Sequence, residues 1–199
     1  MSDIICVTNK KLCADDFLAR IDKITKAGVK AVILREKELG EKEYLSLASE
    51  VKRICDLYGT AFIPHSFVSA AKKLGCNALH LPLGALKELE KGDKEGFDTL
   101  GTSVHSISDA LEAQSLGCSY LVAGHIFETD CKKGLAGRGL DFLSDVCRSV
   151  EIPVYAIGGI NSKNISSVRN TGARGACVMS SLMCADNVRE YLTELNNNG

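Results

Sequence analysis

The chain has 199 residues, of which 45% are hydrophobic and 25% charged, so it is long enough to bury a sizeable core. Its 24 basic and 25 acidic residues leave a formal net charge of −1 at pH 7. This balance provides no broad basic surface, and we expect neither nucleic acid nor a membrane as a partner. No Pro-, Ser- or Gly-rich tract divides the pattern, which predicts one domain over residues 1–199.

The nine cysteines are scattered, and no Cys-x-x-Cys pair occurs among them. Such spacing is typical neither of a structural zinc site nor of a disulfide scaffold, so most thiols are expected to be reduced core residues. The N-terminus lacks a basic stretch followed by a long apolar one, and no window approaches a membrane span. These features predict a cytoplasmic protein.

An amphipathic segment that ends in glycine, followed within a few residues by a short apolar run, occurs five times. The glycines are Gly28, Gly59, Gly75, Gly117 and Gly172. Glycine just past a helix adopts the left-handed conformation that ends it, and a short apolar run suits a buried parallel strand. The chain is therefore expected to repeat a strand–helix unit.

In chain order, the expected strands are residues 4–7, 31–34, 61–63, 78–81, 100–104, 120–123, 154–157 and 176–179. Between them, apolar residues recur at helical spacing, most clearly in residues 44–58. Ser106 with Asp109 is expected to cap one helix, and Asn161 or Ser162 another. Eight strands alternating with eight helices predict a compact α/β fold, a (β/α)₈ TIM barrel; a doubly wound open sheet is the alternative.

Four histidines lie at or near the ends of consecutive apolar runs: His65, His80, His105 and His125. In a TIM barrel the carboxyl ends of the strands share the face that carries the active site, so the four are expected to line one side of the mouth. His125 also opens a long polar segment, and histidine is the side chain that titrates near neutral pH. Their positions alone do not say which of the four acts.

Paired glycines, Gly158 and Gly159, directly follow the seventh expected strand. They leave backbone N–H groups uncovered, and a helix is expected soon after, so this loop can hold a phosphate. Ser180 and Ser181 follow the eighth strand, and phosphate sites after strands seven and eight recur in barrels. The four residues form a candidate phosphate site; a tight turn with incidental serines is the alternative.

Two cations alternate at the end of the second strand, Arg35 and Lys37, and therefore share a face. Together they can clamp a second anionic group. A solvated charge cluster that includes Glu36 and Glu38 is the alternative, which composition alone favours.

The segment 128–139 is polar, rich in glycine and longer than most loops of this kind, which is typical of a lid or binding loop. Thr129, Lys132 and Lys133 can contact an anionic ligand from it. Cys131 lacks local support as a nucleophile and is interpreted as a bystander.

Five segments resemble one family: Leu-Arg-Glu-Lys on the second strand, Gly-Thr-Ser-Val-His-Ser at the fifth, Phe-x-Thr-x-x-Lys after the sixth, Ala-Ile-Gly-Gly-Ile after the seventh and Val-Met-Ser-Ser after the eighth. In this order they resemble the thiamine phosphate synthase/TenI superfamily of small barrels, over about residues 4–185. The resemblance implies a phosphorylated thiazole as the small-molecule ligand. It implies binding roles for Arg35, Lys37, Ser103, Thr129 and Lys132.

Synthases of this superfamily carry Asn-Asp-Arg after the third strand and another aspartate after the fourth, which bind the magnesium of a pyrimidine diphosphate. This chain has Pro-His-Ser at 64–66 and Leu-Gly-Ala at 83–85. Synthases also have a glutamine where Ile33 stands and Gly-Pro where this chain has Gly-His at 124–125. Magnesium needs oxygen ligands, so we expect no metal and no cofactor here.

The run Gly-His-Ile-Phe-Glu-Thr-Asp-Cys-Lys-Lys-Gly, with Gly-Arg-Gly shortly after, looks like the TenI branch. TenI proteins are thiazole tautomerases, which isomerise a carboxythiazole phosphate tautomer to the aromatic carboxythiazole phosphate, and the histidine of this motif is implicated in proton transfer. The resemblance therefore implies a tautomerase with His125 as the catalytic residue and Arg35 facing the carboxylate. The alternatives are a thiamine phosphate synthase and a non-catalytic protein that binds thiazole phosphates or regulates. The sequence leaves a homo-oligomer open.

Overall fold

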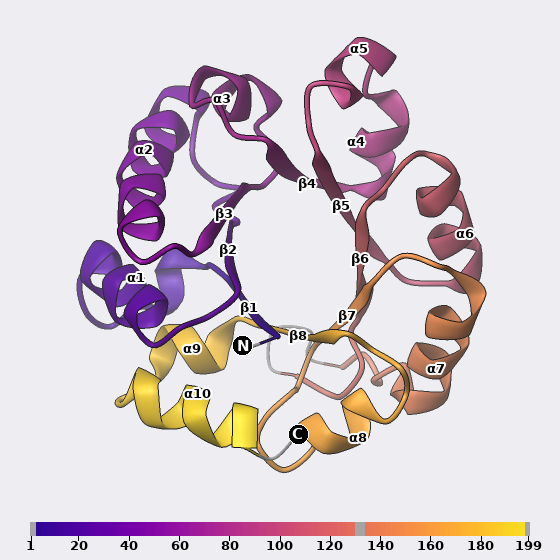
Figure 1. The fold of residues 1–199 in the computed structure, drawn as a ribbon. Coiled ribbons are helices and arrows are strands. Elements are labelled where there is room, and N and C mark those ends of the chain that lie inside the picture. Colours follow the sequence, from indigo (N-terminus) through magenta and orange to yellow (C-terminus); the bar gives the residue numbers. More distant parts are fainter. Residues whose placement is uncertain (1–2, 130–133, 198–199) are drawn as a thin grey trace.

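The computed structural model describes residues 3–129 and 134–197, in which eight parallel strands form a ring with helices around it (Figure 1). Every predicted strand occurs, with ends that differ by at most one residue. The strands are β1 (Ile4–Val7), β2 (Ala31–Leu34), β3 (Ala61–Pro64), β4 (Ala78–Pro82), β5 (Thr99–Val104), β6 (Tyr120–Gly124), β7 (Val154–Ile157) and β8 (Gly175–Val178).

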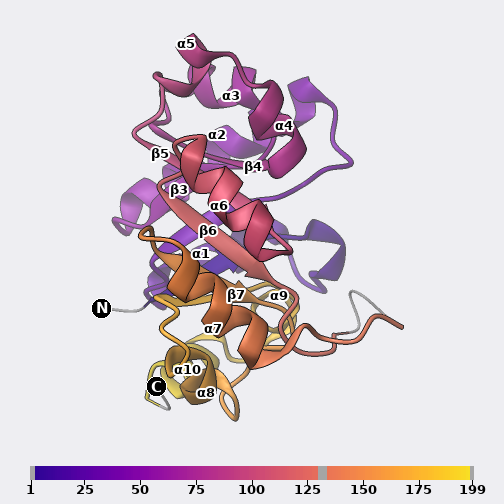
Figure 2. The same cartoon turned by 90° about the vertical axis from the view of Figure 1, so that its right-hand side faces the viewer.

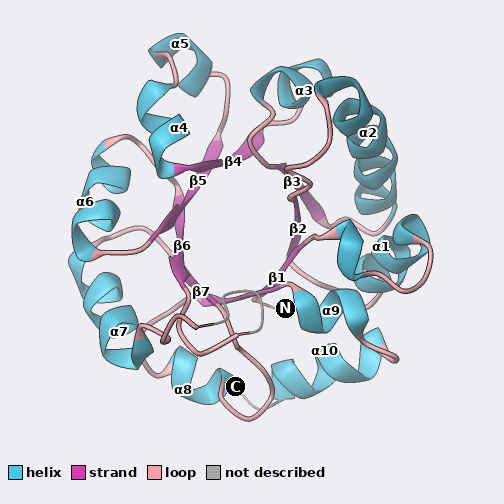
Figure 3. Ribbon diagram, turned by 180° about the vertical axis from the view of Figure 1, so that it is seen from behind, coloured by secondary structure: helices cyan, strands magenta, loops and turns pink. Residues whose placement is uncertain are grey.

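The expectation of one helix per strand is too simple for the described residues, because β1 is followed by an extra 3-10 helix and β4 and β8 by two α-helices each (Figure 3). The helices are η1 (Lys10–Leu12), α1 (Phe17–Lys26), α2 (Glu41–Leu57), α3 (Val68–Lys73), α4 (Leu83–Glu88), α5 (Lys91–Lys94), α6 (Ile107–Ser115), α7 (Gly139–Ser149), α8 (Ile165–Arg169), α9 (Ser180–Cys184) and α10 (Val188–Asn197). None of them combines the length and the apolar character needed to cross a membrane.

The strand order β3-β2-β1-β8-β7-β6-β5-β4 leaves β3 and β4 at the two ends of the sheet. These ends meet, because His65 and His80 form an isolated parallel bridge and the backbone N–H of Ser66 donates to the carbonyl oxygen of His80 at 3.0 Å. The sheet is thereby a nearly closed TIM-like barrel. The doubly wound alternative is wrong, since its outer strands would lie far apart.

The local signals that predicted the repeat are confirmed in most places. The five glycines at the helix-to-strand joints have φ between +63° and +94°, which a side chain would disfavour. Ser106 Oγ accepts from the N–H of Asp109 at 3.0 Å, as expected of a cap. The prediction for α8 is wrong, because this helix begins at Ile165 after Asn164, whereas Asn161 Oδ1 accepts from Lys163 N in a preceding turn.

Two apolar cores hold the barrel together. The larger lies between the strands and the helices, and the smaller fills the interior of the barrel with side chains from alternate strand positions, among them Ile5, Val7, Ala31, Ile33, Ile63, Tyr120, Val122, Tyr155 and Cys177. The eight described cysteines are free thiols, and five of them are buried. This agrees with the expectation that most cysteines are core residues.

Candidate active site

The residues predicted for the site converge on one end of the barrel, because they occupy or follow the carboxyl ends of parallel strands. Figure 2 shows β6 running toward the end of the barrel at which the described residues before α7 extend outward. Ser103 lies near the end of β5, Arg35 follows β2, and Gly158 follows β7. Lys132, Lys133 and Cys131 lie outside the described residues.

His125 is the residue after β6, and its side chain is only 7% exposed. Its Nε2 lies 3.3 Å from the carbonyl oxygen of Leu135, a long contact, and its Nδ1 is buried with no hydrogen-bond partner among the described residues. A buried polar atom without a partner costs free energy and calls for an explanation, such as a role in chemistry. The peptide bond that joins Gly124 to His125 is cis.

The backbone around His125 is held on both sides. Its carbonyl oxygen accepts from the N–H of Arg138, and the next residue, Ile126, donates to the carbonyl oxygen of Ile157 at 2.9 Å. Nδ1 of His105 lies 2.6 Å from the carbonyl oxygen of Gly124. A carbonyl only accepts, so His105 Nδ1 carries the proton and fixes the peptide that leads into His125. The sequence placed His105 at the mouth but did not reveal this contact.

Gly158 and Gly159 have φ of +105° and +66°, and both pack against the segment that follows β6. A Cβ on Gly158 would lie 2.5 Å from Cβ of His125, and one on Gly159 would lie 2.5 Å from the carbonyl oxygen of Glu128. No hydrogen bond from either N–H to another described residue is found. This loop therefore combines close approach to His125 with backbone donors that remain available for a ligand.

The helix predicted to strengthen this loop begins later than expected. Between Gly159 and α8 lies a turn in which Asn164 Nδ2 donates to the carbonyl oxygen of Gly159 at 2.9 Å. The positive end of α8 is therefore separated from the paired glycines, and the loop's capacity to hold an anion rests on its own N–H groups.

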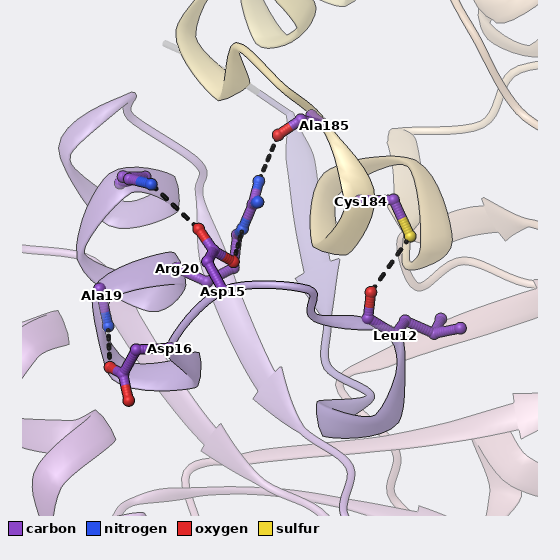
Figure 4. Close-up of polar contacts among 8 residues, drawn as sticks. Leu12, Asp15, Asp16, Ala19, Arg20, Cys184 and Ala185 are labelled. Atoms are coloured by element: carbon purple, nitrogen blue, oxygen red, sulfur yellow. Dashed lines mark hydrogen bonds and ion pairs between the residues drawn. The ribbon is translucent and has the colours of Figure 1, made fainter.

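Ser180 and Ser181, both half-buried, begin α9 directly after β8. Figure 4 shows how the end of this helix is tied to the start of the chain: the Arg20 guanidinium donates to the carbonyl oxygen of Ala185 and pairs with Asp15 at 3.0 Å. Cys184 Sγ, 3.4 Å from the carbonyl oxygen of Leu12, adds a second tie. The two serines thus stand on an anchored element.

Arg35 and Lys37 form the cationic side of the mouth, and the solvated cluster offered as their alternative is wrong for Glu36. This carboxylate is 9% exposed and accepts from Thr8 Oγ1 at 2.6 Å and from the N–H of Lys10 at 3.0 Å. Glu38, for its part, pairs with the ammonium of Lys11. Neither Arg35 nor Lys37 forms an ion pair with a described carboxylate, and burial together with the Arg35 charge lowers the pKa of Lys37.

The expectation that four histidines line the mouth is wrong for His80, which lies within β4 and faces the barrel interior. Its ring stacks on that of His65, with centroids 5.4 Å apart. Burial lowers the pKa of each imidazole to about 3, helped by the charges of Arg35 and Lys37. Both histidines are therefore neutral at physiological pH, and they mark the seam of the barrel.

The residues present do not fit the magnesium that the synthase branch implies. At the end of β3, His65 Nδ1 is hydrogen-bonded to Ser66 Oγ at 2.8 Å, and α4 begins with Leu83 where the second aspartate would stand. The charged groups that act on His65 are the cations Arg35 and Lys37. Within residues 3–129 and 134–197, no three His, Cys, Asp or Glu side chains form a group able to hold a metal ion.

Comparisons with known proteins agree with this architecture. A family model described as thiamine monophosphate synthase matches residues 4–182. The thiamine-phosphate synthase of Fusobacterium nucleatum is 34% identical over 203 residues, which cover 97% of this chain and 97% of that protein. A thiamine-phosphate synthase of Clostridium botulinum (strain 657 / Type Ba4) is 37% identical over 168 residues, which cover 81% of this chain and 80% of that protein.

Solved structures give the same result. The thiamine phosphate pyrophosphorylase from Pyrococcus furiosus superposes with a TM-score of 0.85 at 28% identity, covering 98% of this chain and 94% of its own. A 3-hexulose-6-phosphate synthase, at 16% identity and a TM-score of 0.74, shares the fold alone. The chain therefore belongs to the thiamine phosphate synthase/TenI family and is an enzyme of thiamine biosynthesis.

Proposed function

We propose that this enzyme is a thiazole tautomerase, which isomerises a carboxythiazole phosphate tautomer to the aromatic carboxythiazole phosphate. The observation that carries the proposal is His125 itself: a buried imidazole at the mouth whose Nδ1 has no partner among the described residues, packed against the Gly158 turn. The departures at residues 64–66 and 83–85, where the donor set does not suit magnesium, support the same choice.

The reaction moves a proton from one carbon to another, and formation of an aromatic ring makes it strongly downhill. One imidazole is sufficient, because it accepts a proton on its unprotonated nitrogen and then returns a proton to the second carbon. The N–H groups of Gly158 and Gly159 and the hydroxyls of Ser180 and Ser181 hold the phosphate. Arg35 faces the carboxylate, and Thr129 and Lys132 contribute from the loop after β6.

The test is His125→Gln, assayed with the carboxythiazole phosphate tautomer. Since an amide cannot exchange the proton, we expect kcat to fall by about 10²- to 10⁴-fold. Binding of the aromatic product, measured by titration calorimetry, should change little, because the phosphate contacts lie on other residues. Unchanged turnover would remove His125 from the mechanism, and tight binding by a wild-type protein that does not isomerise the tautomer would favour a non-catalytic or regulatory binder.

A second candidate is thiamine phosphate synthesis, which the names of the relatives favour, at 34% and 37% identity. The enzyme would be incubated with hydroxymethylpyrimidine diphosphate, thiazole phosphate and Mg²⁺, with the tautomer assay run in parallel on the same preparation. Efficient formation of thiamine phosphate would replace the tautomerase proposal.

A further inference from the structure

A chain of three polar side chains crosses the barrel interior and ends at the mouth. Tyr120 Oη lies 3.0 Å from His80 Nδ1, and His80 Nε2 lies 3.0 Å from Ser103 Oγ. Tyr120 and His80 are 6% and 2% exposed, whereas Ser103 is half-buried near the end of β5. Ser103 is therefore the one of these three groups that is accessible to a ligand in the mouth.

The protons of this chain can be assigned from its partners. Burial raises the pKa of Tyr120 well above its ordinary value and lowers that of His80, so the phenol stays protonated and the imidazole neutral. No acceptor other than His80 Nδ1 is found for the Tyr120 hydroxyl among the described residues. The phenol therefore donates to Nδ1, because the reverse arrangement would leave its own proton buried without a partner. His80 Nε2 then carries the ring proton and donates it to Ser103 Oγ.

The barrel makes room for this arrangement at one position. Gly101 is paired in register with His80 on β4 and with Tyr120 on β6. A Cβ on Gly101 would lie 2.1 Å from Cζ of Tyr120. The absence of a side chain there lets the tyrosine ring pass across β5 and reach a histidine two strands away.

With its oxygen already accepting from His80, Ser103 has its own proton free to donate toward the mouth. Arg35 and Lys37 act electrostatically on the same His80. A hydroxyl donor in a mouth that also carries two cations suits an anionic oxygen. The donors proposed for the phosphate lie around Gly158 after β7, which is separated from β5 by β6.

We propose that the Tyr120–His80–Ser103 chain fixes Ser103 as a hydrogen-bond donor to the carboxylate of the substrate, with Tyr120 and His80 as positioning residues. This rests on the proposed function, since the tautomerase substrate is the one that carries a carboxylate in addition to its phosphate. The donor acts on the carboxylate and takes no part in the proton transfer at His125.

A double-mutant cycle tests the chain in the intact enzyme. We expect Ser103→Ala to lower kcat/KM for the tautomer by about 10- to 30-fold, as for a hydrogen bond to a charged group, and Tyr120→Phe to lower it by about 3- to 10-fold. Because Tyr120 acts through Ser103, the double variant should match Ser103→Ala alone. A loss in the double variant equal to the product of the two single losses would overturn the proposal. The matched control is Tyr155→Phe, which removes the hydroxyl of the neighbouring buried tyrosine and should leave kcat/KM unchanged.

A binding measurement separates this proposal from the proposed function. Each protein is titrated with carboxythiazole phosphate and with the same thiazole phosphate lacking the carboxylate. Ser103→Ala and Tyr120→Phe should weaken binding of the carboxylated ligand only, by a factor similar to the loss in kcat/KM. Equal weakening of both ligands would refute the carboxylate contact. If wild-type enzyme fails to isomerise the tautomer yet shows this discrimination, the proposed function fails and the donor assignment stands.

The tautomer of His80 is accessible without any variant. In a ¹⁵N-labelled protein, long-range ¹H–¹⁵N correlation spectra should show His80 protonated on Nε2 and unprotonated on Nδ1 at neutral pH, both with and without carboxythiazole phosphate. Protonation on Nδ1 would reverse the direction of the chain, make Ser103 the donor to His80, and overturn the proposal.

Discussion

The two sides of the barrel are built in opposite ways. On the β6–β7 side, His125 is buried with an unpaired Nδ1 and is held by backbone contacts, and a Cβ on Gly158 would lie 2.5 Å from its own Cβ. On the β3–β5 side, His65 and His80 are equally buried, but their rings stack and bond to neighbouring hydroxyls. Burial is therefore common to all three histidines, and the unpaired ring nitrogen distinguishes His125, the residue proposed to move the proton, from the two whose rings are paired.

After the loss of His125 itself, the largest expected effect comes from a change on the β6–β7 side at Gly158. Gly158→Ala would place a Cβ 2.5 Å from that of His125 at a φ of +105°. We expect the free energy of unfolding to fall by about 2–4 kcal/mol, from strain and overpacking together. Displacement of the imidazole by a fraction of an ångström should also lower kcat by about 100-fold. Urea denaturation and the tautomer assay provide the two measurements.

Gly28→Ala is the matched control for this variant. Gly28 has a φ of +94°, and a Cβ there would meet nothing within 4 Å. It should therefore lose about 1–2 kcal/mol from backbone strain alone and keep full turnover. If the two substitutions affected kcat equally, the contact between Gly158 and His125 would have no catalytic meaning.

On the β3–β5 side, the two buried histidines should be detected through the pH dependence of stability rather than through turnover. His65 and His80 each have a pKa of about 3 in the folded protein, below the ordinary value of 6.5, so the unfolded chain binds more protons between these two values. Stability is therefore complete above about pH 6.5 and falls as the pH decreases, by about 1.4 kcal/mol per pH unit for each histidine. Urea unfolding at about pH 7, 6 and 5 measures this slope.

His80→Gln removes one of the two histidines that take up a proton on unfolding. It should therefore reduce the slope of stability against pH, between about pH 6.5 and 5, by about half relative to wild type. Gly28→Ala serves again as a control, because it lowers stability by the same amount at each pH. A slope that His80→Gln leaves unchanged would mean that His80 does not take up a proton on unfolding in this range.

The sequence predicted the fold well, because each signal is local. Glycines at helix ends and short apolar runs set the strands to within a residue, and barrel geometry then placed Arg35, Ser103 and Gly158 at one end. The position of His80 was misjudged, because an apolar run with one histidine does not show which residue ends the strand.

Contacts between strands distant in sequence were not predictable in the same way. Glu36 looked like part of a charged cluster until its partners Thr8 and Lys10 were known. The path of Tyr120 to His80 depends on Gly101, which lies on the strand between them, so it needs the register of three strands at once. A sequence pattern of period two supplies the facing direction of each residue but not that register.

A smaller effect is expected at Ser180, which is proposed to contact the phosphate. Ser180→Ala removes one hydroxyl donor from the charged phosphate and should raise KM by about 10-fold with little change in kcat. Ser166→Ala, an exposed serine on the neighbouring helix α8, is the matched control and should leave KM unchanged. An unaltered KM in Ser180→Ala would leave phosphate binding to the backbone N–H groups of the β7 loop.

The smallest effect is expected at Lys37. It tests whether this lysine acts on the ligand through its charge or through a direct hydrogen bond. Lys37 is exposed and, within the described part of the chain, has no carboxylate partner, so its charge works largely through solvent. Lys37→Ala should raise KM by about 2- to 3-fold at about 0.05 M salt and lose this effect near 0.5 M, where screening is strong. Lys72→Ala, which removes an exposed lysine already paired with Asp93, should show neither change. A Lys37 effect that persisted at high salt would instead require a direct hydrogen bond from Lys37 to the ligand, like the one proposed for Ser103.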